Sequence, residues 1–329
     1  MLAFIVRRLL QAIVVLLAVA FIAFALFQYV GDPVLAMLGQ DATPQQRAEL
    51  RSELGLDQPF YVQFGRFLGN ATGGDFGLSY RQGRKVATLI QERLPATLEL
   101  SLAAAALALA LGIPLGVYTA LRRRGFFAHL LLAISLIGVS LPTFVIGILL
   151  ILVFAVLLGW LPSYGRGETV ALGGWNSGLL TWDGWQHLLL PAITLCLFQL
   201  TLIMRLVRAE MLEVLRTDYI KFARARGLAD RSVYFGHALR NTLVPVITIT
   251  GLQLGSIIAF AIVTETVFQW PGMGLLFIQA VQAADIPVMA AYLCLIALIF
   301  VIINLFVDLL YFAVDPRLRI ERSATAHPS

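Results

Sequence analysis

Six long runs of apolar residues constrain the fold of this 329-residue chain more than any other feature. They cover residues 9–30, 98–120, 126–160, 187–208, 244–266 and 288–314. A helix needs about 20 apolar residues to cross a bilayer, and in lipid its backbone amides must be satisfied within the segment. Only 13% of the residues are charged, against about a quarter in a soluble domain. We therefore expect an all-α integral membrane protein with six transmembrane helices.

The run at residues 126–160 leaves two alternatives. At about 1.5 Å per residue it measures about 50 Å, against a hydrocarbon core of about 30 Å. One tilted helix, kinked near Pro142 or extended along the interface, competes with a hairpin of two helices. With one helix, both termini are cytoplasmic, and that side carries 16 of the 24 basic and 7 of the 19 acidic residues. A hairpin would place the most basic loop outside, so the positive-inside rule favours one long helix.

The apolar runs also divide the chain into segments. Residues 1–30 are interpreted as a retained first transmembrane helix, because their apolar run is longer than that of a cleaved signal peptide. Residues 31–97 form an external segment, and residues 98–322 form the main transmembrane domain of five helices, which includes a basic loop at 209–243. Residues 323–329 are expected to be a disordered tail.

Two external parts have local signals of their own. In the first, Thr43 can cap a short helix at 44–54 that begins with Pro44. The second is a loop at 161–186, rich in Gly and Trp. Its tryptophans could lie at the level of the lipid headgroups, as an aromatic belt does; they are Trp175, Trp182 and Trp185.

Several kinds of chemistry are absent from the sequence. The two lysines, Lys85 and Lys221, do not follow glycine, so there is no Gly-Lys-Ser/Thr phosphate-binding loop and the chain is not expected to hydrolyse ATP. No protease, lipase or metal-site motif occurs, and Cys196 and Cys294 lie inside apolar runs, as buried thiols do. We therefore expect a non-catalytic chain without a cofactor or metal of its own.

Ionisable residues near the predicted spans are few. They are Glu99, Arg205, Glu265 and Asp308, all close to predicted helix ends. Snorkelling of the charged group towards the interface explains such positions. Because ion-coupled transporters need ionisable groups inside the membrane, a proton pump or antiporter is disfavoured.

The basic loop at 209–243 carries the clearest local pattern. A helical stretch can end at Gly227 in a left-handed cap, and a second helix can then begin with Asp230 as its N-cap. Alanines alternate with Arg224 and Arg226 just before the glycine. From physical chemistry alone, such an amphipathic helix lies either on anionic lipid or in the groove of a partner protein.

The stretch from Tyr219 to Pro245 resembles the signature loop of ABC importer permeases, in the form typical of the dipeptide/oligopeptide/nickel family. Lys221-Phe222-Ala223 stands where the general pattern has Glu-Ala-Ala, and Arg240-Asn241 stands where it has Leu-Pro, while Gly227 is retained. The resemblance implies that this loop docks on an ATPase subunit. The implied coupling residues are Asp218, Tyr219, Ala223, Arg224, Ala225, Arg226, Gly227, Leu228, Arg231, Arg240 and Asn241.

The resemblance extends over nearly the whole chain. Further matching motifs are Arg7-Arg8, Gly31-Asp32-Pro33, Leu54-Gly55-Leu56-Asp57, Gly74-Asp75-Phe76-Gly77-Leu78-Ser79, Arg93-Leu94-Pro95-Ala96-Thr97, Pro114-Leu115-Gly116, Ser140-Leu141-Pro142-Thr143-Phe144, Trp270-Pro271-Gly272-Met273-Gly274 and Asp315-Pro316-Arg317. The long external segment is similar to that of the B-type member of a heterodimeric pair.

The family implies a fold, a location and partners. The fold is that of a type I ABC importer permease in the inner membrane. The partners are a second homologous permease, two ATPase subunits that bind ATP and magnesium, an external binding protein and the lipid bilayer. No nucleic acid is expected. The implied cargo is a short peptide, with nickel chelates, glutathione or oligosaccharides as alternatives. A stand-alone secondary transporter is the competing class.

Two Gly-x-x-x-Gly patterns allow close helix packing, at Gly112–Gly116 and Gly251–Gly255. They fit either packing within the chain or contact with the second permease subunit along the pathway. Residues 268–287 are expected to form a short re-entrant or external helix. The candidate pathway and subunit-interface residues are Ser140, Pro142, Gln253, Gly255, Ser256 and Ala259.

Overall fold

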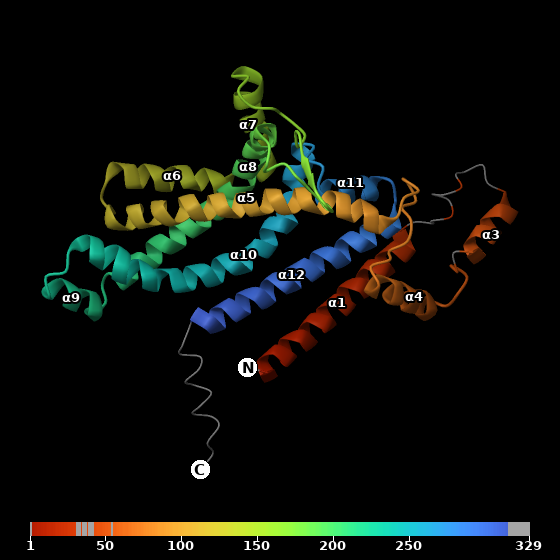
Figure 1. Cartoon of the computed structure of the whole chain (residues 1–329), viewed down its shortest axis with the longest axis horizontal. Helices are drawn as coiled ribbons and strands as arrows, with labels where there is room; N and C mark the ends of the chain where they lie inside the picture. The colour runs from red at the N-terminus through yellow and green to blue at the C-terminus, as the bar shows by residue number, and fades with distance from the viewer. Residues whose placement is uncertain (1, 31–33, 35–37, 39–42, 54, 315–329) are drawn as a thin grey trace, which may run out of the picture. The chain divides into compact units, whose positions relative to one another are not determined.

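The computed structural model describes residues 2–30, 34, 38, 43–53 and 55–314 (Figure 1). The helices are α1 (Leu2–Val30), α3 (Pro44–Glu53), α4 (Phe60–Thr72), α5 (Val86–Leu121), α6 (Phe126–Ser140), α7 (Thr143–Leu150), α8 (Trp182–Val214), α9 (Asp218–Ala225), α10 (Leu239–Val267), α11 (Met273–Gln282) and α12 (Ile286–Val314). Two π-helical segments, η1 (Ile151–Leu157) and η2 (Ser232–Ala238), extend α7 and precede α10, and β1 (Val170–Leu172) pairs antiparallel with β2 (Trp175–Ser177). The predicted motifs at 31–33 and 315–317 and the tail at 323–329 lie outside the described residues.

The prediction of six spans is confirmed in number. Within the described residues, four helices are long and apolar enough to cross a membrane, and two bent pairs raise the number to six when each pair is one span. α5 begins at Val86, well before the predicted start at residue 98. The short helix expected within 268–287 is α11.

The long run at 126–160 is not one continuous helix. α6 ends at Ser140, and the α7–η1 piece leaves it at an angle of 110°. Pro142 has no N–H to donate and disfavours helical backbone at the preceding residue, so the run is interrupted at the proline where a kink was predicted. The bend is far larger than the expected kink, and Figure 1 shows α7 turning away from the direction of α6.

The chain forms two compact units. The first comprises Met1–Glu99, Tyr164–Trp185 and Gln269–Val301, and the second comprises Leu100–Ser163, Gln186–Phe268 and Ile302–Ser329. In the first unit, the amphipathic helix α4 packs on α1 through aromatic rings. Phe60, Phe64 and Phe67 recur on one face of α4, and their ring centroids lie 5.3 to 5.7 Å from those of Phe21 and Phe24.

The short helix α3 confirms its predicted start. The Thr43 hydroxyl oxygen accepts a hydrogen bond from the backbone N–H of Gln46 at 3.3 Å, and the Gln46 side chain accepts one from the backbone N–H of Thr43 at 3.0 Å. This reciprocal pair is a capping box.

In the second unit, small residues bring helices into close contact. A Cβ added at Gly116 would lie 2.6 Å from Val207 of α8, and one added at Gly112 would lie 3.0 Å from Ile203. A Cβ at Gly251 would lie 2.5 Å from Val307 of α12. Of the two alternatives for the Gly-x-x-x-Gly patterns, packing within the chain therefore holds for these three glycines.

Candidate functional site

The loop between α8 and α10 folds into two short helical segments joined by a tight turn. α9 ends in a Schellman motif, in which the N–H of Leu228 donates to Ala223 O at 3.3 Å and the N–H of Gly227 donates to Arg224 O at 2.9 Å. Gly227 has φ +77°, which confirms the predicted left-handed cap. Apart from its two chain neighbours, no described residue has an atom within 4 Å of a Cβ built there, so backbone conformation and not space restricts this position.

The second segment begins one residue earlier than the sequence pattern indicates. Asp230 already has helical backbone, and the N–H groups of Ser232 and Val233 donate to Ala229 O at 2.9 and 3.1 Å. Ala229 therefore stands at the cap, and the prediction of Asp230 as N-cap is wrong. Asp230 lies in the first turn, where its charge suits the helix dipole.

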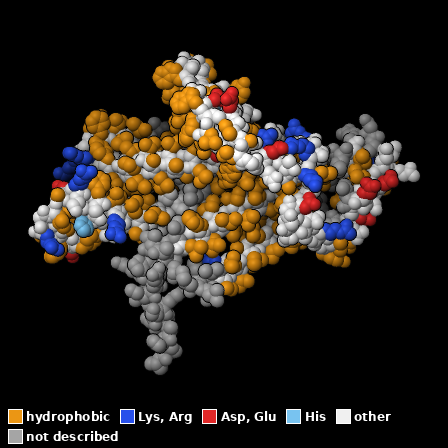
Figure 2. Space-filling view, viewed as in Figure 1, with side chains coloured by type: hydrophobic (Ala, Val, Ile, Leu, Met, Phe, Trp, Pro, Cys, Tyr) orange, Lys and Arg blue, Asp and Glu red, His pale blue; other side chains and the backbone are white. Residues whose placement is uncertain are grey.

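One face of this pair of segments is buried and the other is exposed. Ile220, Ala223, Val233 and Ala238 are buried and hold the two segments in the fold. Large apolar side chains face outward, with exposed fractions of 43% for Tyr219, 64% for Phe222, 40% for Leu228 and 54% for Phe235. We call the surface formed by residues 218–241 the α9 platform; Figure 2 shows Lys and Arg side chains gathered around it.

Polar contacts order the α9 platform. The Asn241 side chain donates to the Tyr219 hydroxyl at 2.6 Å, tying α10 to α9. Arg224 lies over the Tyr234 ring at 5.8 Å, and Arg226 lies over the Phe222 ring at 5.9 Å, both within the range of cation–π attraction.

The predicted coupling residues are brought together on this platform. All except Ala223 are exposed; they are Asp218, Tyr219, Arg224, Ala225, Arg226, Gly227, Leu228, Arg231, Arg240 and Asn241. Lys221 bonds Asp218 at 2.8 Å, and that hydrogen bond and the lysine charge hold the pKa of the carboxyl group below its usual value. The arrangement offers a contact surface for another molecule.

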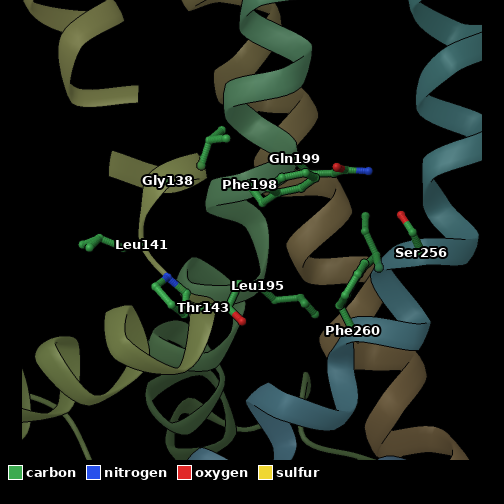
Figure 3. Close-up of a pocket in the computed structure, with 11 residues that line it drawn as sticks. Gly138, Leu141, Thr143, Leu195, Phe198, Gln199, Ser256 and Phe260 are labelled. Atoms are coloured by element: carbon green, nitrogen blue, oxygen red, sulfur yellow. The ribbon is translucent and has the colours of Figure 1, made fainter. Parts of the chain in front are cut away.

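The candidate pathway residues lie only partly together. A cavity of about 210 Å³ lies between the α6–α7 break, α8 and α10 (Figure 3). Pro142 and Ser256 line it, and the Ser256 hydroxyl lies 2.9 Å from Gln253 Oε1. Gly255 is buried, whereas Ser140 and Ala259 are exposed, and none of these three lines the cavity. Sequence reasoning missed Gln199, a buried residue of α8 that also lines this cavity.

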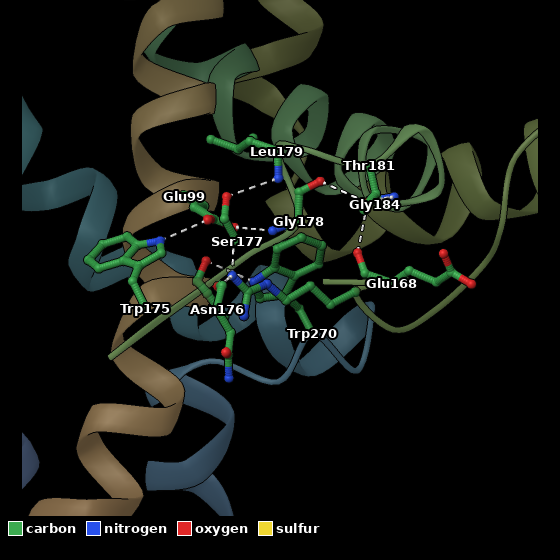
Figure 4. A network of polar contacts seen from close by, with 12 residues as sticks. Glu99, Glu168, Trp175, Asn176, Ser177, Gly178, Leu179, Thr181, Gly184 and Trp270 are labelled. Atoms are coloured by element: carbon green, nitrogen blue, oxygen red, sulfur yellow. Dashed lines mark hydrogen bonds and ion pairs between the residues drawn. The ribbon is translucent and has the colours of Figure 1, made fainter. Parts of the chain in front are cut away.

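Sequence reasoning also mistook Glu99 for a snorkelling residue. Glu99 is only 3% exposed, and its carboxylate accepts from Arg166 at 2.6 Å, from the Trp175 indole at 3.0 Å and from the N–H of Gly178 at 3.3 Å (Figure 4). Arg166, itself 8% exposed, also donates to Asn176 O. A buried charge needs a partner, so the ion pair anchors residues 164–185, which carry both strands and which we call the β1–β2 loop, to Glu99 of α5.

The predictions of snorkelling charges and of a tryptophan belt hold only in part. Glu265 is fully buried, so snorkelling is wrong there as well, whereas Arg205 is exposed and the side chain of Asp308 lies outside the described part. Among the tryptophans of the predicted belt, Trp182 is 78% exposed and Trp185 is 48% exposed, but Trp175 turns inward to Glu99.

A second buried carboxylate fixes the turn after α4. Asp285 accepts from the Ser79 hydroxyl, from the N–H of Tyr80 at 3.1 Å and from the N–H of Arg81 at 3.3 Å. Burial, and then the charge of Asp285, raise the pKa of the Tyr80 phenol to about 12. These contacts join segments more than 200 residues apart in the sequence, and no local pattern announces them.

Comparisons with known proteins agree over nearly the whole chain. Residues 112–320 match the family described as binding-protein-dependent transport system inner membrane component, and residues 1–102 match the N-terminal part of such components. The chain is 41% identical over 336 residues to a di/tripeptide transport system permease protein of Pseudomonas aeruginosa, which covers 98% of this chain and 100% of the relative.

Other relatives carry related names. A dipeptide transport system permease protein of Alkalihalophilus pseudofirmus is 38% identical, covering 97% of this chain and 100% of the relative, and a glutathione transport system permease protein of Escherichia coli is 39% identical, covering 97% and 99%. An inward-facing structure of the MetNI methionine ABC transporter shares the fold, with a TM-score of 0.54, 19% identity and coverage of 67% of this chain and 93% of that chain. The multi-pass helical fold, the α9 platform and these matches lead to one conclusion: the chain belongs to the family of binding-protein-dependent transport system inner membrane components.

Proposed function

We propose that this chain forms half of the translocation pathway of an ATP-driven importer for short peptides in the inner membrane. Its relatives are named for dipeptides, for di- and tripeptides and for glutathione, which is itself a tripeptide. Glutathione, nickel-chelate or oligosaccharide cargo remain the alternatives for this importer type. The assembly contains a second homologous permease, two ATPase subunits that carry ATP and magnesium, and an external binding protein.

The observation that carries the proposal is the α9 platform. Phe222 and Phe235 expose more than half of their surface, and both precede the apolar run at residues 244–266. An exposed apolar patch outside the bilayer is typical of a protein contact, and the surrounding arginines suit an acidic partner. The platform is therefore assigned to the ATPase subunit, and movement of that subunit on ATP binding would pull on α9 and α10.

Gly227→Val tests this role. A β-branched residue at φ +77° costs about 1–3 kcal/mol of backbone strain, and it changes the angle between α9 and η2. In a complex reconstituted in liposomes, the variant should assemble and bind loaded binding protein, but stimulation of ATP hydrolysis and peptide uptake should fall together. Gly227→Asn is the matched control, because asparagine tolerates left-handed backbone, and it should retain most of both activities.

The competing assignments give different results. Contact of α9 with lipid alone predicts wild-type uptake and ATP turnover in the Gly227→Val complex, which would refute docking. A stand-alone secondary transporter predicts that the purified chain takes up peptide into liposomes without ATPase subunits, and such uptake would overturn the importer assignment.

A further inference from the structure

The break between α6 and α7 and the bend within α10 meet at the cavity of about 210 Å³ in the second unit. One wall is the α6–α7 break, which includes Pro142 and Thr143, and the opposite wall is α10 just after its bend. The two parts of α10, which end and begin at Gly251 and Gly255, meet at 53°. Irregular backbone at membrane depth is tolerated where it is covered by protein or lines a cavity, and transporters commonly bind solutes at such breaks.

A polar cluster lies on one side of this mostly apolar cavity. Gln199 extends from α8 towards α10 (Figure 3), where its side-chain nitrogen donates to Gln253 O at 3.3 Å. Gln199 is 2% exposed, and its Oε1 has no hydrogen-bond partner among the residues that the structure describes. A buried acceptor without a donor costs about 1–3 kcal/mol, so this oxygen favours any ligand that brings an N–H or O–H group.

The side chain of Gln199 can turn at small cost. Oε1 is buried, but the last side-chain torsion of glutamine is soft, so rotation moves the oxygen while the stem stays packed. Gln253 O does not then lose its last donor, because the Ser256 hydroxyl also lies 2.7 Å from it. The cluster therefore holds the carbonyl at the α10 bend in either orientation of Gln199.

We propose that this cavity binds one residue of a peptide in transit, with Gln199 Oε1 accepting the peptide's main-chain amide N–H. The inference rests on the proposed function and names a cargo contact within it. The volume lies below the range of about 300–1,000 Å³ for whole-ligand pockets, so the cavity takes part of a solute. Among the described residues, no charged side chain lines the cavity, and a neutral amide is therefore favoured over the terminal ammonium, whose desolvation would go uncompensated.

The test uses the full reconstituted complex, two variants and two cargoes. Gln199→Met keeps the length and packing of the side chain but removes the amide, and Thr194→Val is the control, because Thr194 is a buried residue of α8 that bonds Leu190 O and does not line the cavity. The cargoes are alanyl-alanine and its analogue with a methylated peptide nitrogen. Affinity of each cargo for the binding protein is measured separately, and maximal uptake rates are compared at saturating loaded binding protein.

In the wild-type complex, the N–H peptide should move about three- to tenfold faster than the methylated one, as one hydrogen bond allows. That ratio should fall to near one in Gln199→Met and remain unchanged in Thr194→Val. The ratio does not depend on how much complex assembles. If Gln199→Met gives no assembled complex, Gln199→Asn replaces it; this variant withdraws the oxygen by one methylene and should lower the ratio in the same way. If the ratio is unchanged in the Gln199 variant while uptake still depends on ATP, the contact is overturned and the importer assignment stands. If uptake by the wild-type complex does not depend on ATP, the importer assignment itself is rejected.

Discussion

Removal of the Glu99 carboxylate should release the β1–β2 loop from α5. Glu99→Ala leaves the Arg166 guanidinium buried at 8% exposure without its counter-charge, and it leaves the Trp175 indole and the N–H of Gly178 without their acceptor. Breaking a buried pair in this way costs about 3–5 kcal/mol. Because each 1.4 kcal/mol is about a factor of ten, the open population of the loop should rise at least about 100-fold.

Hydrogen exchange of peptides from residues 164–185, followed by mass spectrometry on the purified complex, measures that opening directly. Glu168→Ala is the matched control, because Glu168 lies in the same loop, is exposed, and bonds Asp183 through its backbone N–H. The pair Glu99→Leu with Arg166→Met should exchange more slowly than Glu99→Ala alone, since no charge is then left buried. Exchange in Glu99→Ala within about twofold of the Glu168→Ala control would refute the anchoring role.

Three further predictions concern the topology, the packing of α5 on α8 and the cap of α3. In a background without native cysteines, a cysteine at Trp175 should react with an impermeant thiol reagent added outside, and one at Arg231 should not; labelling of position 231 would reverse the topology. Gly116→Leu should block assembly, and Gly112→Leu should also disrupt it, because Val207 and Ile203 occupy the space; near-native yields of both would remove close α5–α8 packing. Thr43→Ala should cost about 1 kcal/mol of α3 stability, seen as faster exchange of residues 44–53 and not of α4.

Features caused by neighbouring residues could be predicted from the sequence. The capping box at Thr43, the left-handed Gly227 and the break at Pro142 each depend on a residue's own conformational limits. The α9 platform was recognisable for the same reason, since its turn and its arginines lie within one short segment. Its exposed apolar face was not, because only packing decides that Ile220 turns inward and Phe222 turns outward.

Features caused by distant partners could not be predicted. Glu99 meets Arg166 across 67 positions of sequence, and the only signal was a single carboxylate at the start of an apolar run. Snorkelling explains such a carboxylate equally well until its partner is known. Gln199 gave no signal either, because an isolated glutamine in an apolar helix acquires meaning only from the carbonyl at the α10 bend.

A proline in an apolar run does not by itself predict whether the helix breaks. Pro142 stands at the α6–α7 break, yet Pro191 and Pro245 lie inside the continuous helices α8 and α10. α10 bends instead between Gly251 and Gly255, beyond its proline. A missing N–H makes a break cheaper in each case, but the packing around each proline decides whether the helix breaks there. At the α10 bend, Gln253 O accepts from the Gln199 side chain and from the Ser256 hydroxyl, so the side chains that contact this carbonyl also form the polar side of the cavity.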